Sequence, residues 1–188
     1  MKFDFHMPDA LKKFKRKMAV ILPKDVGAII AYADIGKESI VVEVGAGNGF
    51  LTYYLSRIAN RVYAYEIRED AFEILKYNMK LIKANNVILK NQDGKYFDEK
   101  DVDVVIADIP DAHNMALRAF ENLKAGGFFV CFLPNIEQVK ETCKKARAIF
   151  KHIFVLSTLH IDYKIDENST RPENKGIVHT AYLLFAKK

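Results

Sequence analysis

The segment SIVVEVGAGNGFL, residues 39–51, decides the fold of this chain. Ile40–Val44 is a short run of β-branched residues interrupted by one carboxylate, which is typical of a buried parallel strand. Three glycines follow at alternate positions, and apolar residues then recur at helical spacing from Leu51. Glycine permits unusual backbone dihedrals and lets a ligand approach the backbone at the start of a helix. The segment therefore predicts a strand, a tight turn and a helix that together bind a nucleotide.

The spacing of the glycines and the next acid indicate which nucleotide is bound. A dinucleotide site needs G-x-G-x-x-G, whereas here the third glycine comes one residue early and Glu43 precedes the loop. Residues 61–65 form a second apolar strand that ends at Glu66, roughly 20 residues after the first glycine, where a carboxylate can accept both ribose hydroxyls. Together these features resemble motifs I and II of the class I S-adenosylmethionine-dependent methyltransferases.

Composition favours one intracellular domain. The 188 residues are 50% hydrophobic, yet no apolar run approaches the roughly 18 residues of a membrane span, and the N-terminus lacks a signal-peptide core. We therefore expect a soluble cytoplasmic protein without membrane association. Cys131 and Cys143 lack metal-ligand spacing, so we expect reduced cysteines and no metal site. The net charge of +5 favours contact with a polyanion such as RNA, although the basic clusters also fit ordinary solvated faces.

The remaining pattern predicts an α/β fold. Strands are expected at 87–89, 102–107 and 127–133, and helices at 69–83, 111–123 and 136–146. The chain then changes to two strands in succession, 153–161 and 178–185, separated by a polar loop at 166–175, and such strands must be antiparallel neighbours. This ending matches the Rossmann-like class I methyltransferase fold, a seven-stranded mixed sheet whose last strand is antiparallel. It argues against a dinucleotide dehydrogenase.

Two regions are expected along the chain. Residues 1–20 are basic and read as an arm or a short helix, with Leu11, Phe14 and Met18 on one helical stripe. Residues 21–188 form the methyltransferase domain, which opens with a helix that has Pro23 in its first turn.

Several further segments resemble the catalytic domain of the tRNA (adenine-N1)-methyltransferases. They are PKD at 23–25, YEIRED at 65–70, FLPNIEQV at 132–139 and RPENKGIVHTAYL at 171–183. The resemblance implies methylation of N1 of adenine in tRNA, with S-adenosylmethionine as cofactor, and a homo-oligomer. The chain departs from the family in having only about 20 residues where an N-terminal β domain is expected, Leu22 in place of a tyrosine, and Asp-Ala-His at 111–113 in place of Glu-Pro-Trp.

The resemblance and the strand ends together assign roles to individual residues. Asp108, at the end of the fourth strand, is the expected catalytic residue, which accepts a hydrogen bond from the exocyclic amine of the target base. Glu43 is expected to fix the cofactor's ammonium group, Glu66 its ribose and Asp93 its adenine amino group. The full set expected to bind the cofactor is Glu43, Gly45, Ala46, Gly47, Gly49, Glu66, Ile67, Asp93, Gly94 and Asp108. The set expected to bind substrate is Asn135, Arg171, His179 and Thr180, with Tyr96 and His113 as stacking platforms for an extruded base.

Simpler roles remain open for several of these residues. Asp93 also fits a turn before glycine, Asn135 a helix N-cap, Asp108 a cap or turn acid, and His179 a structural histidine. Two other functions also remain open: a class I methyltransferase of a small molecule or a protein, and a non-catalytic RNA-binding subunit. The complete set of cofactor residues argues against the non-catalytic subunit.

Overall fold

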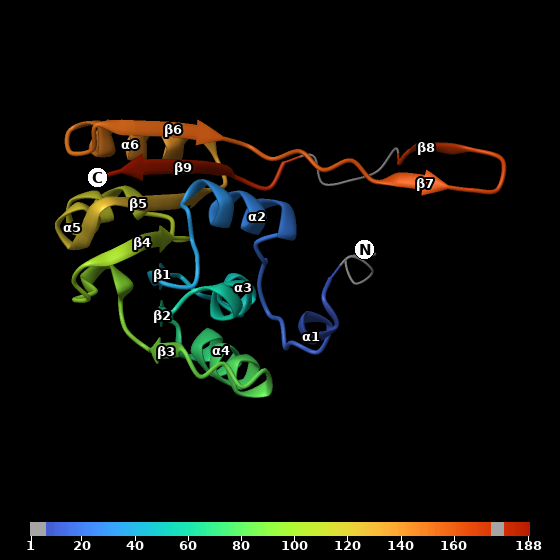
Figure 1. Cartoon of the computed structure of the whole chain (residues 1–188), viewed down its shortest axis with the longest axis horizontal. Helices are drawn as coiled ribbons and strands as arrows, with labels where there is room; N and C mark the ends of the chain where they lie inside the picture. The colour runs from blue at the N-terminus through green and yellow to red at the C-terminus, as the bar shows by residue number, and fades with distance from the viewer. Residues whose placement is uncertain (1–6, 174–178) are drawn as a thin grey trace.

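The structure, a computed structural model, describes residues 7–173 and 179–188 and is built on one twisted mixed sheet (Figure 1). Its strand order is β3-β2-β1-β4-β5-β9-β6, in which β9 runs antiparallel to both of its neighbours. The α/β fold and the antiparallel last strand predicted from the sequence are confirmed. The strands are β1 Ile40–Val44, β2 Arg61–Tyr65, β3 Val87–Lys90, β4 Val102–Ala107, β5 Leu123–Leu133, β6 His152–Leu156 and β9 Tyr182–Lys187.

Helices cover both faces of the sheet. α2, α3 and α4 bury their apolar sides with Val41, Val62 and Ile106 in one cluster, whereas α5 and α6 pack with Val42 and Val105 in the other. Burial on both faces explains why apolar residues predominate in the parallel strands and do not alternate with polar ones. The helices are α1 Asp9–Lys12, α2 Pro23–Tyr32, α3 Phe50–Ile58, α4 Glu69–Leu81, α5 Ala116–Asn122 and α6 Ile136–Arg147, with short 3-10 turns η1 Gly94–Tyr96 and η2 Ala112–Met115. In the described part of the chain, no helix combines the length and the apolar character that crossing a membrane requires.

The N-terminal region differs from its predicted helical stripe. α1 ends at Lys12, although Leu11 and Phe14 are buried as expected and Phe14 packs edge-on against Phe50, with ring centroids 5.7 Å apart. Beyond α1 the backbone leaves the helical path because its polar groups bond to side chains of the domain. The N–H of Lys17, for example, donates to Asn48 Oδ1 at 2.9 Å.

Two other segments also differ from expectation. The predicted helix at 111–123 is divided into η2 and α5, and β5 already begins at Leu123. The predicted polar loop at 166–175 instead contains part of a hairpin, in which β7 (Tyr163–Ile165) pairs antiparallel with β8 (Thr170–Pro172). The expected sixth strand is accordingly shorter and ends at Leu156, because the chain there leaves the sheet (Figure 1).

We expect Gly49→Ala to lower the free energy of unfolding by about 2 to 4 kcal/mol. Gly49 has a φ of 80°, and a Cβ there would lie 2.7 Å from Leu75 Cδ1 and 2.8 Å from Met79 Cε. The matched control is Gly27→Ala, an exposed position inside α2 with no atom within 4 Å of its added Cβ. That change should stabilise the protein by about 0.5 to 1 kcal/mol, as measured by urea denaturation. Equal effects of the two substitutions would contradict the packing argument.

Candidate active site

The candidate site lies at the carboxyl edge of the parallel strands. Val44, the last residue of β1, pairs with Tyr65 at the end of β2 and with Ala107 at the end of β4. The next residues of these three strands therefore emerge at the same level of the sheet; they are Gly45, Glu66 and Asp108. A cavity of about 450 Å³ opens there, and nine of the ten residues predicted to bind the cofactor line it.

The glycine loop is held tightly against β2 and β4. The N–H groups of Gly45 and Ala46 both donate to the carbonyl of Tyr65, at 2.9 and 3.0 Å. Gly45 has a φ of 85°, and a Cβ there would lie 2.3 Å from the carbonyl oxygen of Asp108. Glycine is required at this position for two reasons: the backbone has a positive φ, and there is no room for a Cβ.

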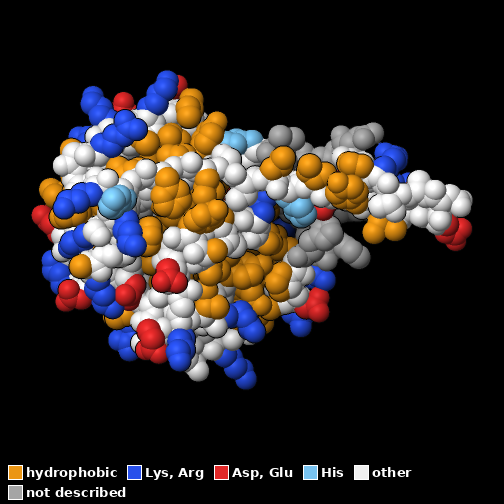
Figure 2. Space-filling view, turned by 45° about the horizontal axis from the view of Figure 1, so that its top comes forward, with side chains coloured by type: hydrophobic (Ala, Val, Ile, Leu, Met, Phe, Trp, Pro, Cys, Tyr) orange, Lys and Arg blue, Asp and Glu red, His pale blue; other side chains and the backbone are white. Residues whose placement is uncertain are grey.

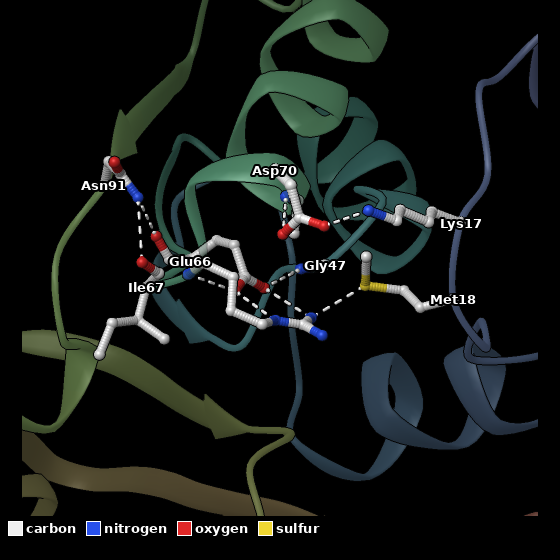
Figure 3. A network of polar contacts seen from close by, with 9 residues as sticks. Lys17, Met18, Gly47, Glu66, Ile67, Asp70 and Asn91 are labelled. Carbon is white, nitrogen blue, oxygen red and sulfur yellow. Dashed lines mark hydrogen bonds and ion pairs between the residues drawn. The ribbon is translucent and has the colours of Figure 1, made fainter.

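Glu66 is almost fully buried and is oriented by the loop (Figure 3). Its Oε2 accepts a hydrogen bond from the N–H of Gly47 at 3.0 Å, and its Oε1 accepts from the N–H and the Nε of Arg68 at 2.9 and 3.1 Å. Asn91 donates to the backbone carbonyl of Glu66 at 2.8 Å. The carboxylate is therefore fixed in place at the cavity wall, where its remaining lone pairs are available to a ligand.

Glu43 and Asp108 are carboxyls whose surroundings disfavour the charged form. Burial raises the pKa of Glu43 to about 8, although Thr52 beside it opposes the shift. Glu43 Oε2 is buried in the cavity wall without a hydrogen-bond partner among the described residues. Burial likewise raises the pKa of Asp108 to about 7, with the charge of Glu66 adding to the effect and that of Arg68 opposing it. Perturbed carboxyls that converge on a cavity are typical of a functional site.

The outer wall of the cavity is a segment that sequence reasoning missed. Residues 15–21, here called the strap, cross in front of the glycine loop, and Met18, Ala19, Val20 and Ile21 line the cavity. Two buried asparagines hold the strap in place. Asn48 accepts from the N–H of Lys17 and donates to the carbonyl of Met18, at 2.9 and 3.1 Å. Asn48 occupies the variable position between Gly47 and Gly49, and the motif does not predict what a residue there contacts. The sequence alone therefore could not reveal this contact with the strap.

The second asparagine, Asn78, links the strap to α4 and to the glycine loop. It is fully buried, accepts from the N–H of Lys15 at 2.9 Å, and donates to the carbonyls of Lys15 and Asn48 at 2.9 and 2.8 Å. Near the other end of α4, Lys17 Nζ forms an ion pair with Asp70 (Figure 3). The strap is thus attached at several points.

Three of the residues predicted to bind the cofactor also have a structural role. Gly49 does not line the cavity; it precedes α3 and packs against α4. Gly94 lines the cavity, but a Cβ there would lie 2.6 Å from Val44 Cγ1, so its lack of a side chain also permits close packing. Asp93 lines the cavity while its Oδ1 caps η1 by accepting from the N–H of Lys95 at 3.0 Å.

The residues predicted to bind substrate do not line this cavity. Asn135 caps α6 by accepting from the N–H of Gln138 at 2.9 Å, which is the simpler role considered for it. His179 Nε2 lies 3.1 Å from the carbonyl oxygen of Pro134, and Arg171 lies exposed on β8. Of the two proposed stacking residues, Tyr96 is 72% exposed.

Thr180 belongs to a polar cluster formed by the PKD segment at the start of α2. Its hydroxyl donates to Asp25 Oδ2 at 2.7 Å, and Lys24 Nζ lies 2.9 Å from Asp25 Oδ1. Asp25 is fully buried, and the hydroxyl of Thr158 completes the cluster with bonds to both Asp25 and Lys24. The cluster joins α2 to the two segments that leave and re-enter the sheet. Among residues 7–173 and 179–188, no group of three or more His, Cys, Asp or Glu side chains is placed to hold a metal.

Comparison with known proteins identifies the family. Residues 12–170 match the family described as tRNA methyltransferase complex GCD14 subunit. The chain belongs to this family. It is also 34% identical, over 213 aligned residues that cover 96% of this chain and 76% of the relative, to the tRNA (adenine(57)-N(1)/adenine(58)-N(1))-methyltransferase TrmI of Methanocaldococcus jannaschii.

Solved structures of methyltransferases show the same fold. The tRNA (m1A58) methyltransferase TrmI of Aquifex aeolicus superimposes with a TM-score of 0.89 at 29% identity, covering 95% of this chain and 73% of that one. A protein of Thermotoga maritima described as a SAM-dependent O-methyltransferase gives a TM-score of 0.87 at 33% identity, covering 92% of this chain and 67% of that one. These similarities confirm the methyltransferase family that the sequence motifs suggested.

We expect the stability of the ligand-free chain to fall as the pH rises from about 5 to 8. The Glu43 carboxyl has a pKa of about 8 in the folded chain and an ordinary value of 4.5, so the folded chain binds more protons than the unfolded chain across this range. Unfolding therefore releases protons and is favoured by rising pH. Between about pH 5 and 8, Glu43 should lower the free energy of unfolding by a few kcal/mol. Glu43→Gln should abolish this contribution and leave only the smaller decrease that Asp108 causes.

The measurement is urea denaturation at several pH values. Glu38→Gln, the same change at an exposed position, is the matched control and should keep the pH dependence of the wild type. The same slope in Glu43→Gln and in the wild type would show that Glu43 does not hold the proton.

Proposed function

We propose that this chain transfers a methyl group from S-adenosylmethionine to N1 of an adenine in tRNA. The observation that supports the proposal most strongly is the convergence of Glu43, Glu66 and Asp108 on one cavity in a GCD14-family chain. The relatives from Methanocaldococcus jannaschii and Aquifex aeolicus are described as tRNA adenine-N1 and m1A58 methyltransferases. We also propose that the chain acts as a homo-oligomer.

The residues of the cavity fit a cationic nucleoside ligand. Among the described residues, the lining includes four carboxyls and a single basic side chain, that of Arg68. A ligand ammonium would satisfy Glu43 Oε2, the buried oxygen without a partner. Glu66, held by Gly47 and Arg68, would accept the ribose hydroxyls, and Asp93 the adenine amino group. S-adenosylmethionine supplies a methyl group that its sulfonium makes electrophilic.

The chain itself would contribute positioning and electrostatics. The N–H of Asp108 donates to the carbonyl of Val44 at 2.9 Å, which fixes its backbone at the end of β4. Ionised Asp108 would accept a hydrogen bond from the exocyclic amine of adenine and stabilise the positive charge that the base acquires on methylation. Met18 and Ile21, on the strap, would exclude water from the cavity. No covalent intermediate with the protein is required.

Binding of the tRNA itself is proposed to rest on charge. The chain carries a net charge of +5, and Arg171 lies exposed on the hairpin, where it would contact phosphate. We propose that His179 and Asn135 lie near the entering nucleotide, His179 with Nε2 beside the carbonyl oxygen of Pro134 and Asn135 bonded to the N–H of Gln138. Thr180 is held by Asp25, so its proposed contribution is to support the site through the cluster at the start of α2.

We expect methyl transfer from radiolabelled S-adenosylmethionine to unmodified bulk tRNA, with the label recovered as N1-methyladenosine on nucleoside analysis. The Thermotoga maritima relative described as an O-methyltransferase makes a hydroxyl acceptor the second candidate. Cofactor binding without label in tRNA would reject the tRNA proposal and favour that second candidate. Failure to bind the cofactor would favour the non-catalytic subunit.

We expect Asp108→Asn to lower kcat about 10²-fold, because the neutral amide cannot stabilise the developing positive charge. Wild-type activity should rise as the pH increases through about 7, the pKa of Asp108. Asp34→Asn makes the same chemical change outside the cavity lining and should leave turnover unchanged. Near-full turnover of Asp108→Asn with unchanged cofactor affinity would remove Asp108 from the reaction.

A further inference from the structure

The loop that follows β4 carries Asp108 and forms one wall of the cavity. Asp108, Ile109 and Pro110 all line the cavity. In the sheet, β4 lies between β1 and β5. The residues expected to bind the cofactor lie on or after β1, β2 and β3, so an acceptor must approach Asp108 from the side of β5. The position of this loop therefore decides how Asp108 meets the acceptor.

The first turn of α6 holds this loop. α6 begins at Ile136, shortly after β5 ends at Leu133, so its first turn lies at the same edge of the sheet as Asp108. In this turn, Gln138 Nε2 donates a hydrogen bond to the carbonyl of Pro110 at 3.1 Å. The bond joins the wall of the cavity to a helix on the side from which the acceptor approaches.

Other contacts fix the two ends of the loop but not its middle. The N–H of Asp108 donates to the carbonyl of Val44 at 2.9 Å. At the other end, Asp111 Oδ2 lies 2.7 Å from Lys95 Nζ, in an ion pair that is partly exposed and so contributes little rigidity. Between these attachments, within the described part of the chain, Gln138 makes the only side-chain hydrogen bond to the backbone of the loop.

The amide of Gln138 has one orientation in this contact. Pro110 offers a carbonyl, which only accepts, so the amide nitrogen faces it and Oε1 points elsewhere. Oε1 is buried without a hydrogen-bond partner among the described residues. Burial of an unpaired oxygen lowers stability, whereas the bond to Pro110 is exposed and water would replace it. Stability alone therefore does not explain a glutamine at this position.

We propose that Gln138 is a positioning residue for methyl transfer, which keeps the Asp108 carboxyl aligned with the incoming acceptor by holding the carbonyl of Pro110. The inference rests on the proposed function, which assigns to Asp108 the hydrogen bond from the acceptor's amine. Gln138 itself does not line the cavity, so it acts through the loop. A small displacement of Asp108 weakens its interaction with the transition state, whereas Glu43 and Glu66 stay in place.

Gln138→Met tests this role. Methionine has a similar length and helix propensity but lacks both the donor and the buried oxygen. We expect kcat with tRNA to fall about tenfold, with the Kd of S-adenosylmethionine unchanged. The KM for tRNA should also be unchanged, because Lys and Arg side chains are spread over the body of the molecule (Figure 2) and phosphate contacts dominate RNA affinity.

Stability should not follow activity in this variant. The urea midpoint of Gln138→Met should equal or exceed that of the wild type, because an unpaired buried oxygen is removed. A lower midpoint accompanied by lower kcat would indicate a merely structural role and would overturn the proposal. Unchanged kcat would overturn it as well.

Two further variants separate the donor from the shape of the side chain. Gln138→Glu has nearly the same shape but no donor at neutral pH, so its kcat should fall at least as far as that of Gln138→Met. Retained turnover in Gln138→Glu would show that the bond to Pro110 is not needed. Glu141→Met, at an exposed position one turn further along α6, is the matched control and should behave like the wild type.

A last measurement needs neither cofactor nor tRNA. In a Glu43→Gln background, the remaining decrease of stability between about pH 5 and pH 8 comes from Asp108, whose pKa is raised by burial and by Glu66 and lowered by Arg68. Adding Gln138→Met should make this decrease smaller, because a displaced loop admits water to Asp108. An unchanged decrease would show that the loop holds its place without Gln138. This result stands even if the wild type transfers no methyl group to tRNA, which would reject only the proposed function.

Discussion

The site depends on the register of β1 between β2 and β4. Val44 pairs with Tyr65 on one side and with Ala107 on the other, so the three strands end together. Parallel strands in this register bring Glu66 and Asp108 to the same edge as the glycine loop, although these residues are far apart in sequence. A shift of one residue in either pairing would turn one carboxyl to the opposite face of the sheet. The buried apolar runs on both faces oppose such a shift.

Burial of acidic groups at this edge connects stability with ligand binding. Glu43 and Asp108 have raised pKa values because the protein offers their charged forms little compensation. Near neutral pH the ligand-free fold is therefore less stable than the same fold with neutral groups at these positions. A cationic ligand would supply the missing compensation, so the same arrangement would favour binding of a sulfonium and an ammonium group. Glu66 differs because Gly47 and Arg68 already provide hydrogen-bond donors.

Two segments that do not belong to the alternating strands and helices are attached to this fold. The strap completes the cavity, held by Asn48 and Asn78 through backbone contacts that do not depend on its own side chains. The segment that follows β6 and carries the hairpin of β7 and β8 starts beside the cluster of Lys24, Asp25, Thr158 and Thr180, which attaches this segment to α2. Both segments are joined to the domain by buried polar side chains, whose hydrogen bonds are directional and so define one geometry.

The sequence by itself determined the sheet, the glycine loop and the acidic residues at the strand ends. These follow from local patterns: apolar runs form strands, glycines permit the turn, and a residue just after a parallel strand must lie at its carboxyl edge. Tertiary structure alone decided that Met18 to Ile21 wall the cavity and that Thr180 bonds within the protein. Both outcomes depend on contacts between residues distant in sequence, such as Lys15 with Asn78 and Lys24 with Thr180. Local periodicity carries no information about such contacts, because they depend on how the completed sheet and helices place one segment against another.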